Sequence, residues 1–358
     1  MIGFAVAMGF GFVQPAIADG ILGGSSQKGM LFLFLFLSVI IGIILIAVLI
    51  ELAHVIGAKL GKYEILSVNI FGFCFFKRKD EEGNIKTQFK FPRNFDGLTG
   101  ETVIRPKNEK SKPIFYIFSP LFFFLIEVLI TVMLFMFFED SKETLTMMYV
   151  KYGSFIATTI GGMVMIYDYF PAKLDNASDG YKLVSLNKKS NIEAYNEYLR
   201  VKACTYFKED AGEIRTFEEI NDFTAKVNML QVNRLAETDY KKAIEMIDTI
   251  IVDPSKISKS TLNSIMLTKT YLIFMNEELE VAKDFYINSL NEEQRKLAVG
   301  CSNALAIRVY MLYEGLVEKS TSEVEIAESK IKKVLNKLPD SEKELESELI
   351  NRVLEKIK

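Results

Sequence analysis

The sequence predicts an α-helical, polytopic membrane protein that carries a soluble helical domain at its C-terminal end. Apolar residues make up 49% of the chain, more than a soluble protein with this many charges needs. Long uncharged runs alternate with short polar loops in the first half, and charged residues with helical periodicity fill the second half. We therefore expect a membrane domain over residues 1–185 and a cytosolic helical domain over residues 186–358.

Four apolar runs account for about four spanning helices. They cover residues 1–18, 30–50, 114–138 and 145–170. The second run has no charged residue and is long enough for the about 20 residues that cross a hydrocarbon core. Glu127 is the only charge inside the third run, and the fourth carries Lys151 and Asp168 near its two ends.

The first run has two interpretations. It ends in Ala16-Ile17-Ala18, which resembles a signal-peptidase site, but it has no positively charged segment before the apolar stretch. We expect a retained helix. A cleaved signal is the alternative, and it leaves the topology of the remaining chain unchanged.

The distribution of Lys and Arg predicts the orientation in the membrane. The loop 59–112 is rich in basic residues, whereas the loop 139–144 holds only Lys142. Because basic loops stay on the cytosolic side, we expect a multi-pass protein of the cell membrane with this loop and the C-terminal domain in the cytosol. The net charge of −3, without a basic groove, argues against nucleic acid as a partner.

The loop 59–112 contains short strand-like segments. Residues 65–72 and 74–77 are rich in aromatic and aliphatic side chains, and residues 85–91 alternate after a turn at 80–84. These segments predict a small β-hairpin at the membrane surface. Its exposed strand would pair with an unwound peptide, or its aromatic residues would serve only as interfacial anchors.

The C-terminal domain reads as a succession of amphipathic helices. They are predicted over residues 239–251, 260–274, 279–290, 292–314, 323–338 and 340–358. Consecutive amphipathic helices of this length resemble a tetratricopeptide-like repeat domain, although no clean repeat of about 34 residues is present. A plain helical bundle is the alternative. In either case we expect this domain to recruit a cytosolic protein partner.

A partial metalloprotease motif stands at the end of the second run. Residues 50–54 read Ile-Glu-Leu-Ala-His, so Glu51 and His54 occupy the last two signature places of H-E-x-x-H, and Ile50 stands in place of the first His. In that motif two histidines one helical turn apart bind a metal, and the glutamate activates the metal-bound water. His54 is the only histidine in the chain.

A second polar segment follows the last apolar run. It contains Asp168, Pro171, Asp175 and the pair Asp179-Gly180. With the Glu51–His54 element, it resembles the site-2 protease family of intramembrane zinc metalloproteases, over roughly residues 30–185. That family pairs H-E-x-x-H with an N-x-x-P…D-G segment, whose Asp is the third zinc ligand.

The resemblance implies a role for each matching residue. Glu51 would be the catalytic base, and His54 and Asp179 would be ligands of a zinc cofactor. Two positions depart from the family, because Ile50 cannot bind a metal and Asp168 stands where the family has Asn. Asp175 is a possible substitute ligand, since it would share a helical face with Asp179.

These departures leave three functions open. A weakened metalloprotease would hydrolyse a membrane peptide or single-span protein near the cytosolic face, with Glu127 and Asp168 along the substrate path. A degenerate pseudoprotease would bind the same kind of partner without cutting it. A membrane scaffold or peptide-handling immunity protein would use only its helical domain, and Glu51 and His54 would then be ordinary interfacial residues.

Overall fold

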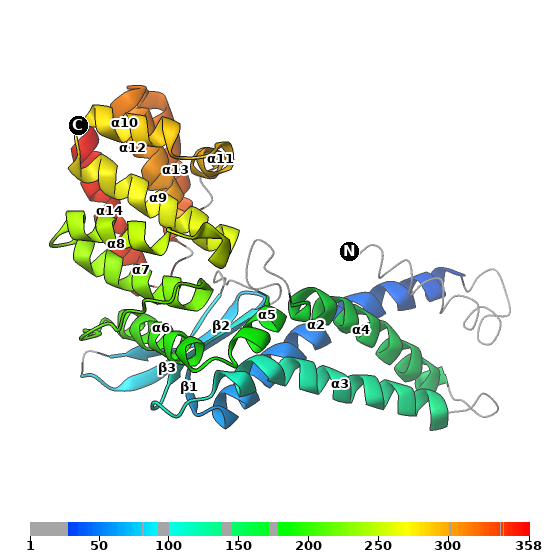
Figure 1. Ribbon diagram of the computed structural model, residues 1–358. Coiled ribbons are helices and arrows are strands. Elements are labelled where there is room, and N and C mark those ends of the chain that lie inside the picture. The colour runs from blue at the N-terminus through cyan, green and yellow to red at the C-terminus, as the bar shows by residue number, and fades with distance from the viewer. Residues whose placement is uncertain are drawn as a thin grey trace. The chain divides into compact units, whose positions relative to one another are not determined.

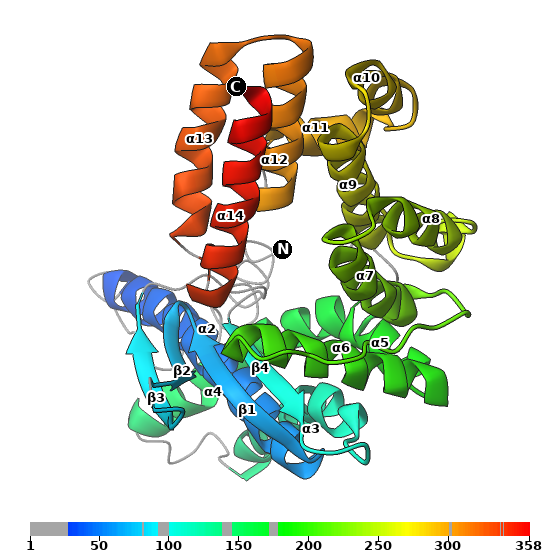
Figure 2. The same ribbon diagram turned by 90° about the vertical axis from the view of Figure 1, so that its left-hand side faces the viewer.

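The computed structural model describes residues 28–80, 82–91, 100–137, 145–171, 178–300, 303–336, 338 and 340–358 (Figures 1 and 2). The chain divides into two compact units. The first, which we call the membrane unit, covers residues 1–75, 95–172 and 178–186. The second, the helical unit, covers residues 76–94, 173–177 and 187–358.

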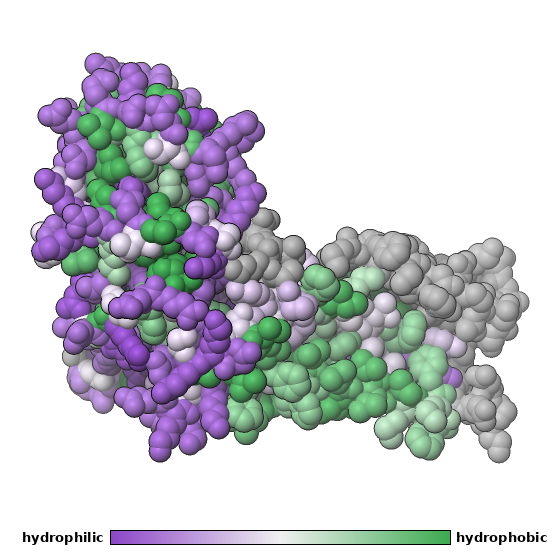
Figure 3. Space-filling view, viewed as in Figure 1, coloured by the Kyte–Doolittle hydropathy of each residue, from purple (hydrophilic) through white to green (hydrophobic). Residues whose placement is uncertain are grey.

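Three long helices form the membrane unit: α2 (Lys28–Leu60), α3 (Pro113–Phe137) and α4 (Leu145–Tyr169). Each packs against the other two. Among the described residues, Phe36–Leu60 and Pro113–Phe137 are long and apolar enough to cross a membrane. The third predicted span is a helix, α4, but it does not reach the same apolarity, and the run 1–18 lies outside the described residues. Apolar side chains gather along the lower right of Figure 3, over part of this unit.

The helices of the membrane unit approach closely where glycine removes a side chain. A Cβ at Gly57 of α2 would overlap the Ser119 side chain and the Phe115 carbonyl of α3. A Cβ at Gly161 of α4 would lie 2.6 Å from the Ile46 side chain. Small residues at helix contacts are typical of helix packing in membranes. There the helices are not driven together by removing apolar surface from water, so close packing matters more.

A four-stranded sheet follows α2. Its strands are β1 (Tyr63–Ile70), β2 (Phe73–Lys79), β3 (Ile85–Lys90) and β4 (Gly100–Pro106), in the order β3-β2-β1-β4. The three predicted strand segments are confirmed, and they are neighbours in a sheet that is larger than the expected hairpin, because β4 pairs antiparallel with β1 on its other side. The Phe71–Gly72 turn has positive φ at both residues, as a tight two-residue hairpin loop requires.

The helical unit is a succession of short helices (Figure 2). They are α6 (Lys189–Phe207), α7 (Asp222–Ala236), α8 (Tyr240–Ile250), α9 (Lys259–Asn276), α10 (Leu279–Asn288), α11 (Glu292–Gly300), α12 (Ala304–Leu312), α13 (Thr321–Leu335) and α14 (Asp340–Ile357). Helices α7 to α14 share a core that includes the fully buried Ile247, Ile265 and Ile307. The last helix contacts the first, and Lys208, the residue directly after α6, forms a 2.5 Å ion pair with Glu344 of α14.

The single helix predicted over residues 292–314 is wrong. The structure has two helices there, α11 and α12, and a π-helical turn at Tyr313–Val317. The side chain of Asn303 accepts a hydrogen bond of 2.8 Å from the backbone N–H of Ala306 and so begins α12. Helix periodicity continues across such a cap, which explains why the pattern alone did not show the break.

A candidate polar site at the end of helix α2

Glu51 lies deep in the membrane unit, against strand β4. Its side chain is buried, and its Oε2 accepts a hydrogen bond of 2.6 Å from Thr102 Oγ1. Strand β4 can approach this closely because residue 100 is glycine. A Cβ there would lie 2.8 Å from Glu51 Oε1 and would overlap the Asn69 carbonyl. The carboxyl expected to be a catalytic base therefore has a hydrogen-bond partner from the sheet.

His54 lies one turn further along α2 and contacts helix α3. Its Nδ1 is 3.2 Å from the backbone carbonyl oxygen of Tyr116, and the two rings lie 4.6 Å apart. The Tyr116 hydroxyl donates a hydrogen bond of 2.8 Å to the Thr102 carbonyl. Glu51, Thr102, Tyr116 and His54 thus form one connected cluster, which joins α2, β4 and α3. We call these four residues the polar cluster.

Asp179 is the first residue of the short helix α5 (Asp179–Ser185). The Ser178 side chain caps this helix by accepting a hydrogen bond of 3.1 Å from the Tyr181 N–H, so this segment is a helix start and not a free turn. The Asp179 carboxylate is buried and forms a 2.5 Å ion pair with Lys182. It also interacts electrostatically with His54.

Asp168, at the end of α4, lies beside Asp179. Its carboxyl interacts with both the carboxyl and the backbone N–H of Asp179. The two segments come this close because residue 180 is glycine, since a Cβ at Gly180 would overlap the Tyr169 carbonyl. The close approach at Gly180 therefore places Asp168 and Asp179 on adjoining segments, whereas Glu51 is held by Thr102. Asp175 lies outside the described residues.

Ile50 occupies the first place of the motif and packs into an apolar cluster. It is buried among Ile46 of the same helix, Phe124 of α3 and Met165 of α4. A metal ligand at this place would need a donor atom and polar surroundings, and this cluster offers neither. The helix face that would carry the first histidine is thus part of the three-helix packing.

The described residues do not fit a zinc site of the expected kind. Such a site takes three protein ligands and leaves one place for water. No group of three or more His, Cys, Asp or Glu side chains in the described part of the chain is placed to hold a metal ion. Of the two residues expected as ligands, Asp179 is already paired with Lys182, and His54 lies beside the Tyr116 carbonyl.

Glu127 lies in the middle of α3, on the side that faces α4. Its Oε1 is 3.5 Å from the hydroxyl of Thr158, which also lies 2.8 Å from the hydroxyl of Thr131. Its other oxygen, Oε2, is buried and has no hydrogen-bond partner among the described residues. Lys151, near the start of α4, places its ammonium group 4.9 Å from the centre of the Phe135 ring.

Sequence reasoning missed Thr102, Tyr116 and Lys182. Thr102 belongs to a strand that was not predicted, and the two others carry no motif, so only the fold places them at the site. Comparison with protein-family models, with curated proteins and with solved structures found no match to this chain. The geometry of the described residues is therefore the basis for the function proposed below.

Proposed function

We propose that this chain is a site-2-protease-like pseudoprotease, which holds a membrane peptide or single-span protein without hydrolysing it. It would sit in the cell membrane as a multi-pass protein, with the helical unit in the cytosol to recruit a protein partner. The observation that carries the proposal is the packing of Ile50 against Phe124 and Met165, at the place where the first zinc ligand would stand.

The polar cluster supports a structural role for the remaining motif residues. Glu51 is buried and accepts a hydrogen bond from Thr102, so its carboxyl links α2 to the sheet. A general base must instead reach the water from which it takes a proton. In this proposal the polar cluster fixes the positions of α2, α3 and β4 relative to one another, and the chain does not hydrolyse peptide bonds.

Binding of a membrane peptide is supported by Glu127. Ionisable groups inside a membrane are costly and usually mark a pathway or a binding site. One oxygen of Glu127 has no hydrogen-bond partner among the described residues, although it lies in an apolar helix. A polar group of a bound peptide would satisfy it.

The sheet has an edge that would accept an extended peptide. Strand β3 is at the edge of the sheet and exposes Ile85 and Phe89. An extended peptide segment would add to this edge by main-chain hydrogen bonds.

A weakened metalloprotease is the second candidate, and one observation favours it. His54 and the helix that begins at Asp179 belong to distant segments, and both pack against α3 in the folded chain. With two protein ligands in place of three, zinc affinity would fall steeply. This candidate predicts slow cleavage that requires Glu51.

Photo-crosslinking of a single-span peptide tests the proposal. The full chain is placed in lipid nanodiscs with a peptide that carries a photoreactive residue at mid-span. We expect a crosslinked adduct that contains the intact peptide. Glu127→Leu should reduce the adduct severalfold, whereas Leu129→Ala, at an exposed position of the same helix, should leave it unchanged.

The result separates the candidates. Peptide cleavage that is lost in Glu51→Gln would reject the pseudoprotease in favour of the protease. Absence of any adduct would reject peptide binding by the membrane unit altogether.

A further inference from the structure

Helix α14 is held by fewer buried side chains than the helices at the centre of the helical unit. It has 18 residues, the same length as α9. Nine residues of α9 are buried, whereas in the described part of α14 the buried side chains are Ile350 and Val353. Helix α14 lies beside α12 and α13 (Figure 2) and also contacts α6. Because an element with few buried apolar contacts opens at a low cost in free energy, we expect α14 to open more readily than α9.

A buried ion pair with poor hydrogen bonding joins α14 to α12. Nη1 of Arg308, a residue that is 5% exposed, lies 3.4 Å from Oε2 of Glu346 in α14. Cζ of Arg308 also lies 4.8 Å from the centre of the Tyr271 ring in α9. Among the described residues, Nε and Nη1 of Arg308 and Oε2 of Glu346 have no hydrogen-bond partner. Such a pair offsets little of the cost of removing two charges from water, so it fixes where α14 docks without holding it firmly.

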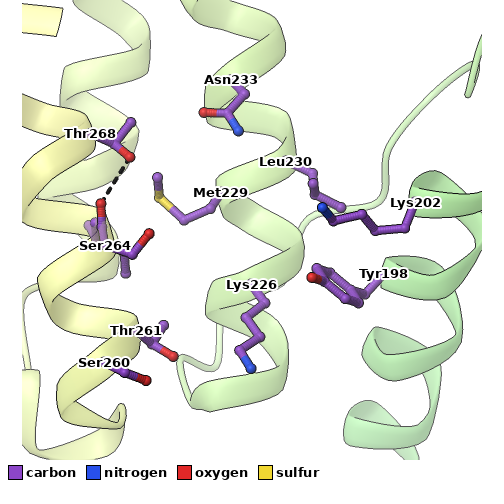
Figure 4. Close-up of a pocket in the computed structure, with 11 residues that line it drawn as sticks. Tyr198, Lys202, Lys226, Met229, Leu230, Asn233, Ser260, Thr261, Ser264 and Thr268 are labelled. Carbon is purple, nitrogen blue, oxygen red and sulfur yellow. Dashed lines mark hydrogen bonds between the residues drawn. The ribbon is translucent and has the colours of Figure 1, made fainter. Parts of the chain in front are cut away.

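Lys202 of α6 acts on the same carboxyl. It interacts electrostatically with Glu346. It also lines a hollow of about 330 Å³ between α6, α7 and α9 (Figure 4). The charge of Lys202 is thus engaged by α14 in the folded chain. Arg308 and Lys202, from two different helices, both direct positive charge at this carboxyl of α14.

The other end of α14 packs against the π-helical turn at Tyr313–Val317. A Cβ at Gly315, in the middle of this turn, would lie 2.6 Å from Cγ2 of Ile357, so the glycine makes room for the end of α14. Single π-helical turns are rare and are frequent at functional sites. Helix α14 is therefore attached in its first half through Glu346 and at its end through Ile357.

We propose that α14 is an exchangeable strap. It opens while α7 to α10 stay folded, and the surface that it uncovers on α6 and α12 takes up an amphipathic helix of a cytosolic partner in its place. The proposal names the kind of partner for the recruitment part of the proposed function and rests on that part.

The contacts of α14 show the chemistry that this surface recognises. They consist of a carboxyl opposite Arg308 and apolar side chains at the places of Ile350, Val353 and Ile357. A partner helix with the same spacing would enter the surface by its apolar face. A carboxylate that accepts hydrogen bonds from the N–H groups of Arg308 would bind more tightly than Glu346 does, because α14 leaves those groups unsatisfied.

Hydrogen exchange of the full chain in detergent micelles, followed by mass spectrometry, tests the opening. We expect the amides of α14 to be at least about tenfold less protected than those of α9, equivalent to about 1.4 kcal/mol. Arg308→Met should lower the protection of α14 at least about tenfold further, because Glu346 loses its counter-charge. Arg352→Met is the matched control. It removes the exposed pair of Arg352 with Glu348 on α14 itself and should leave the protection unchanged.

A second variant weakens the strap without leaving a buried charge. Ile357→Ala removes the contact with Gly315 and should lower the protection of α14 severalfold. Leu345→Ala is its control, because Leu345 lies on the same helix and is 45% exposed. The control should exchange like the parent chain.

A peptide of residues 340–358 tests the surface beneath the strap. Labelled with fluorescein, it should bind the full Ile357→Ala chain more tightly than the parent chain, because the weakened strap leaves the surface open more often. In the peptide, Glu346→Lys should weaken binding at least about tenfold, equivalent to about 1.4 kcal/mol. Glu348→Lys makes the same change in net charge at an exposed position and should leave binding unchanged.

Three results would overturn the proposal. Equal protection of α14 and α9 in the parent chain would show that the two helices unfold together. Equal effects of Arg308→Met and Arg352→Met would show that the buried pair does not hold the strap. Equal binding of the Glu346→Lys and Glu348→Lys peptides would place the peptide on another surface. These measurements use no membrane peptide, so photo-crosslinking of the single-span peptide reports separately on the rest of the proposed function.

Discussion

The carboxyl of Glu51 and the hydroxyl of Thr102 lie 2.6 Å apart, in a hydrogen bond that joins a membrane helix to the sheet that follows it. The sequence places Glu51 in a metalloprotease motif, where it would activate water. In the folded chain it is buried and bound by a strand residue from outside the motif. Glu51 is thus part of the packing between α2 and β4.

Thr102→Val tests how much this hydrogen bond contributes to the stability of the fold. The substitution keeps the shape of the side chain but leaves the buried Glu51 carboxyl without its donor, which costs about 1–3 kcal/mol. We expect the variant to lose its helicity at a lower temperature than the parent chain, as measured by circular dichroism in detergent. Thr159→Val is the control, because the Thr159 hydroxyl donates to the Phe155 carbonyl of its own helix and, among the described residues, to no other segment. Equal effects of the two substitutions would contradict the role assigned to Thr102.

Gly57→Ala tests the close contact of α2 and α3. The new methyl would overlap Ser119 and the Phe115 carbonyl, so the helices must separate, and we expect a loss of about 1–3 kcal/mol by the same measurement. Gly153→Ala in α4 is the control. Its Cβ would meet nothing within 4 Å, and alanine favours a helix by about 1 kcal/mol over glycine. A Gly57→Ala variant as stable as the parent chain would show that α2 and α3 have room for a methyl group at this contact.

The fold was predictable from the sequence where patterns are local. Helix α8, expected over residues 239–251, spans Tyr240–Ile250 with Asp239 as its N-cap, because its apolar spacing and cap are both in the sequence. Strand β4 was missed because a strand is defined by its partner, and β1 lies 30 or more residues earlier in the chain. Such long-range pairing leaves no local signal beyond alternation.

The site was predictable in part for the same reason. The residues Glu51, His54 and Asp179 were proposed from their spacing, and His54 and the helix that begins at Asp179 both pack against α3. The partner of Glu51 was not predictable, because Thr102 approaches only when Gly100 lets the backbone of β4 come close. The packing of Ile50 likewise depends on Phe124 and Met165 from two other helices.

A buried ion pair in the helical unit gives a third prediction. Arg308 Nη1 of α12 lies 3.4 Å from Glu346 Oε2 of α14, and both side chains are largely buried. Burial raises the pKa of Glu346, and the nearby Arg308 opposes that rise. Arg308→Met alone should cost about 3–5 kcal/mol, because it leaves a buried carboxyl without its counter-charge.

The double variant Arg308→Met/Glu346→Leu is the matched control for that prediction. Replacement of a buried ion pair by apolar residues is often neutral or stabilising. We therefore expect the double variant to recover most of the stability lost in Arg308→Met, measured by urea unfolding of the full chain. A double variant as unstable as the single one would show that the charges are not what couples the two residues.

The Glu197–Arg200 pair predicts a dependence of stability on pH. Burial raises the pKa of Glu197, but two hydrogen bonds of 2.8 Å from Arg200 and one of 3.1 Å from the Arg215 N–H outweigh it. The pKa is therefore held below its ordinary value of 4.5. A lowered carboxyl pKa stabilises the fold fully above the unfolded value, and this contribution is lost as pH falls through the folded value.

Glu197→Gln should therefore lower stability near neutral pH and make the loss of stability below pH 4.5 shallower. Thermal unfolding across the acid range measures both effects. Glu280→Gln, at an exposed position of α10, is the control and should follow the parent chain. An unchanged acid slope in Glu197→Gln would assign the pH dependence to other carboxyls.

Zinc content of the purified full chain tests the central claim most directly. The claim is that apolar packing at Ile50 has replaced the metal site, so mass spectrometry of the unmodified protein should find far less than one zinc per chain. Ile50→His, which restores the first signature residue beside His54, should raise zinc content. One tightly held zinc per unmodified chain, lost in Asp179→Ala, would contradict the claim and identify a working metalloprotease.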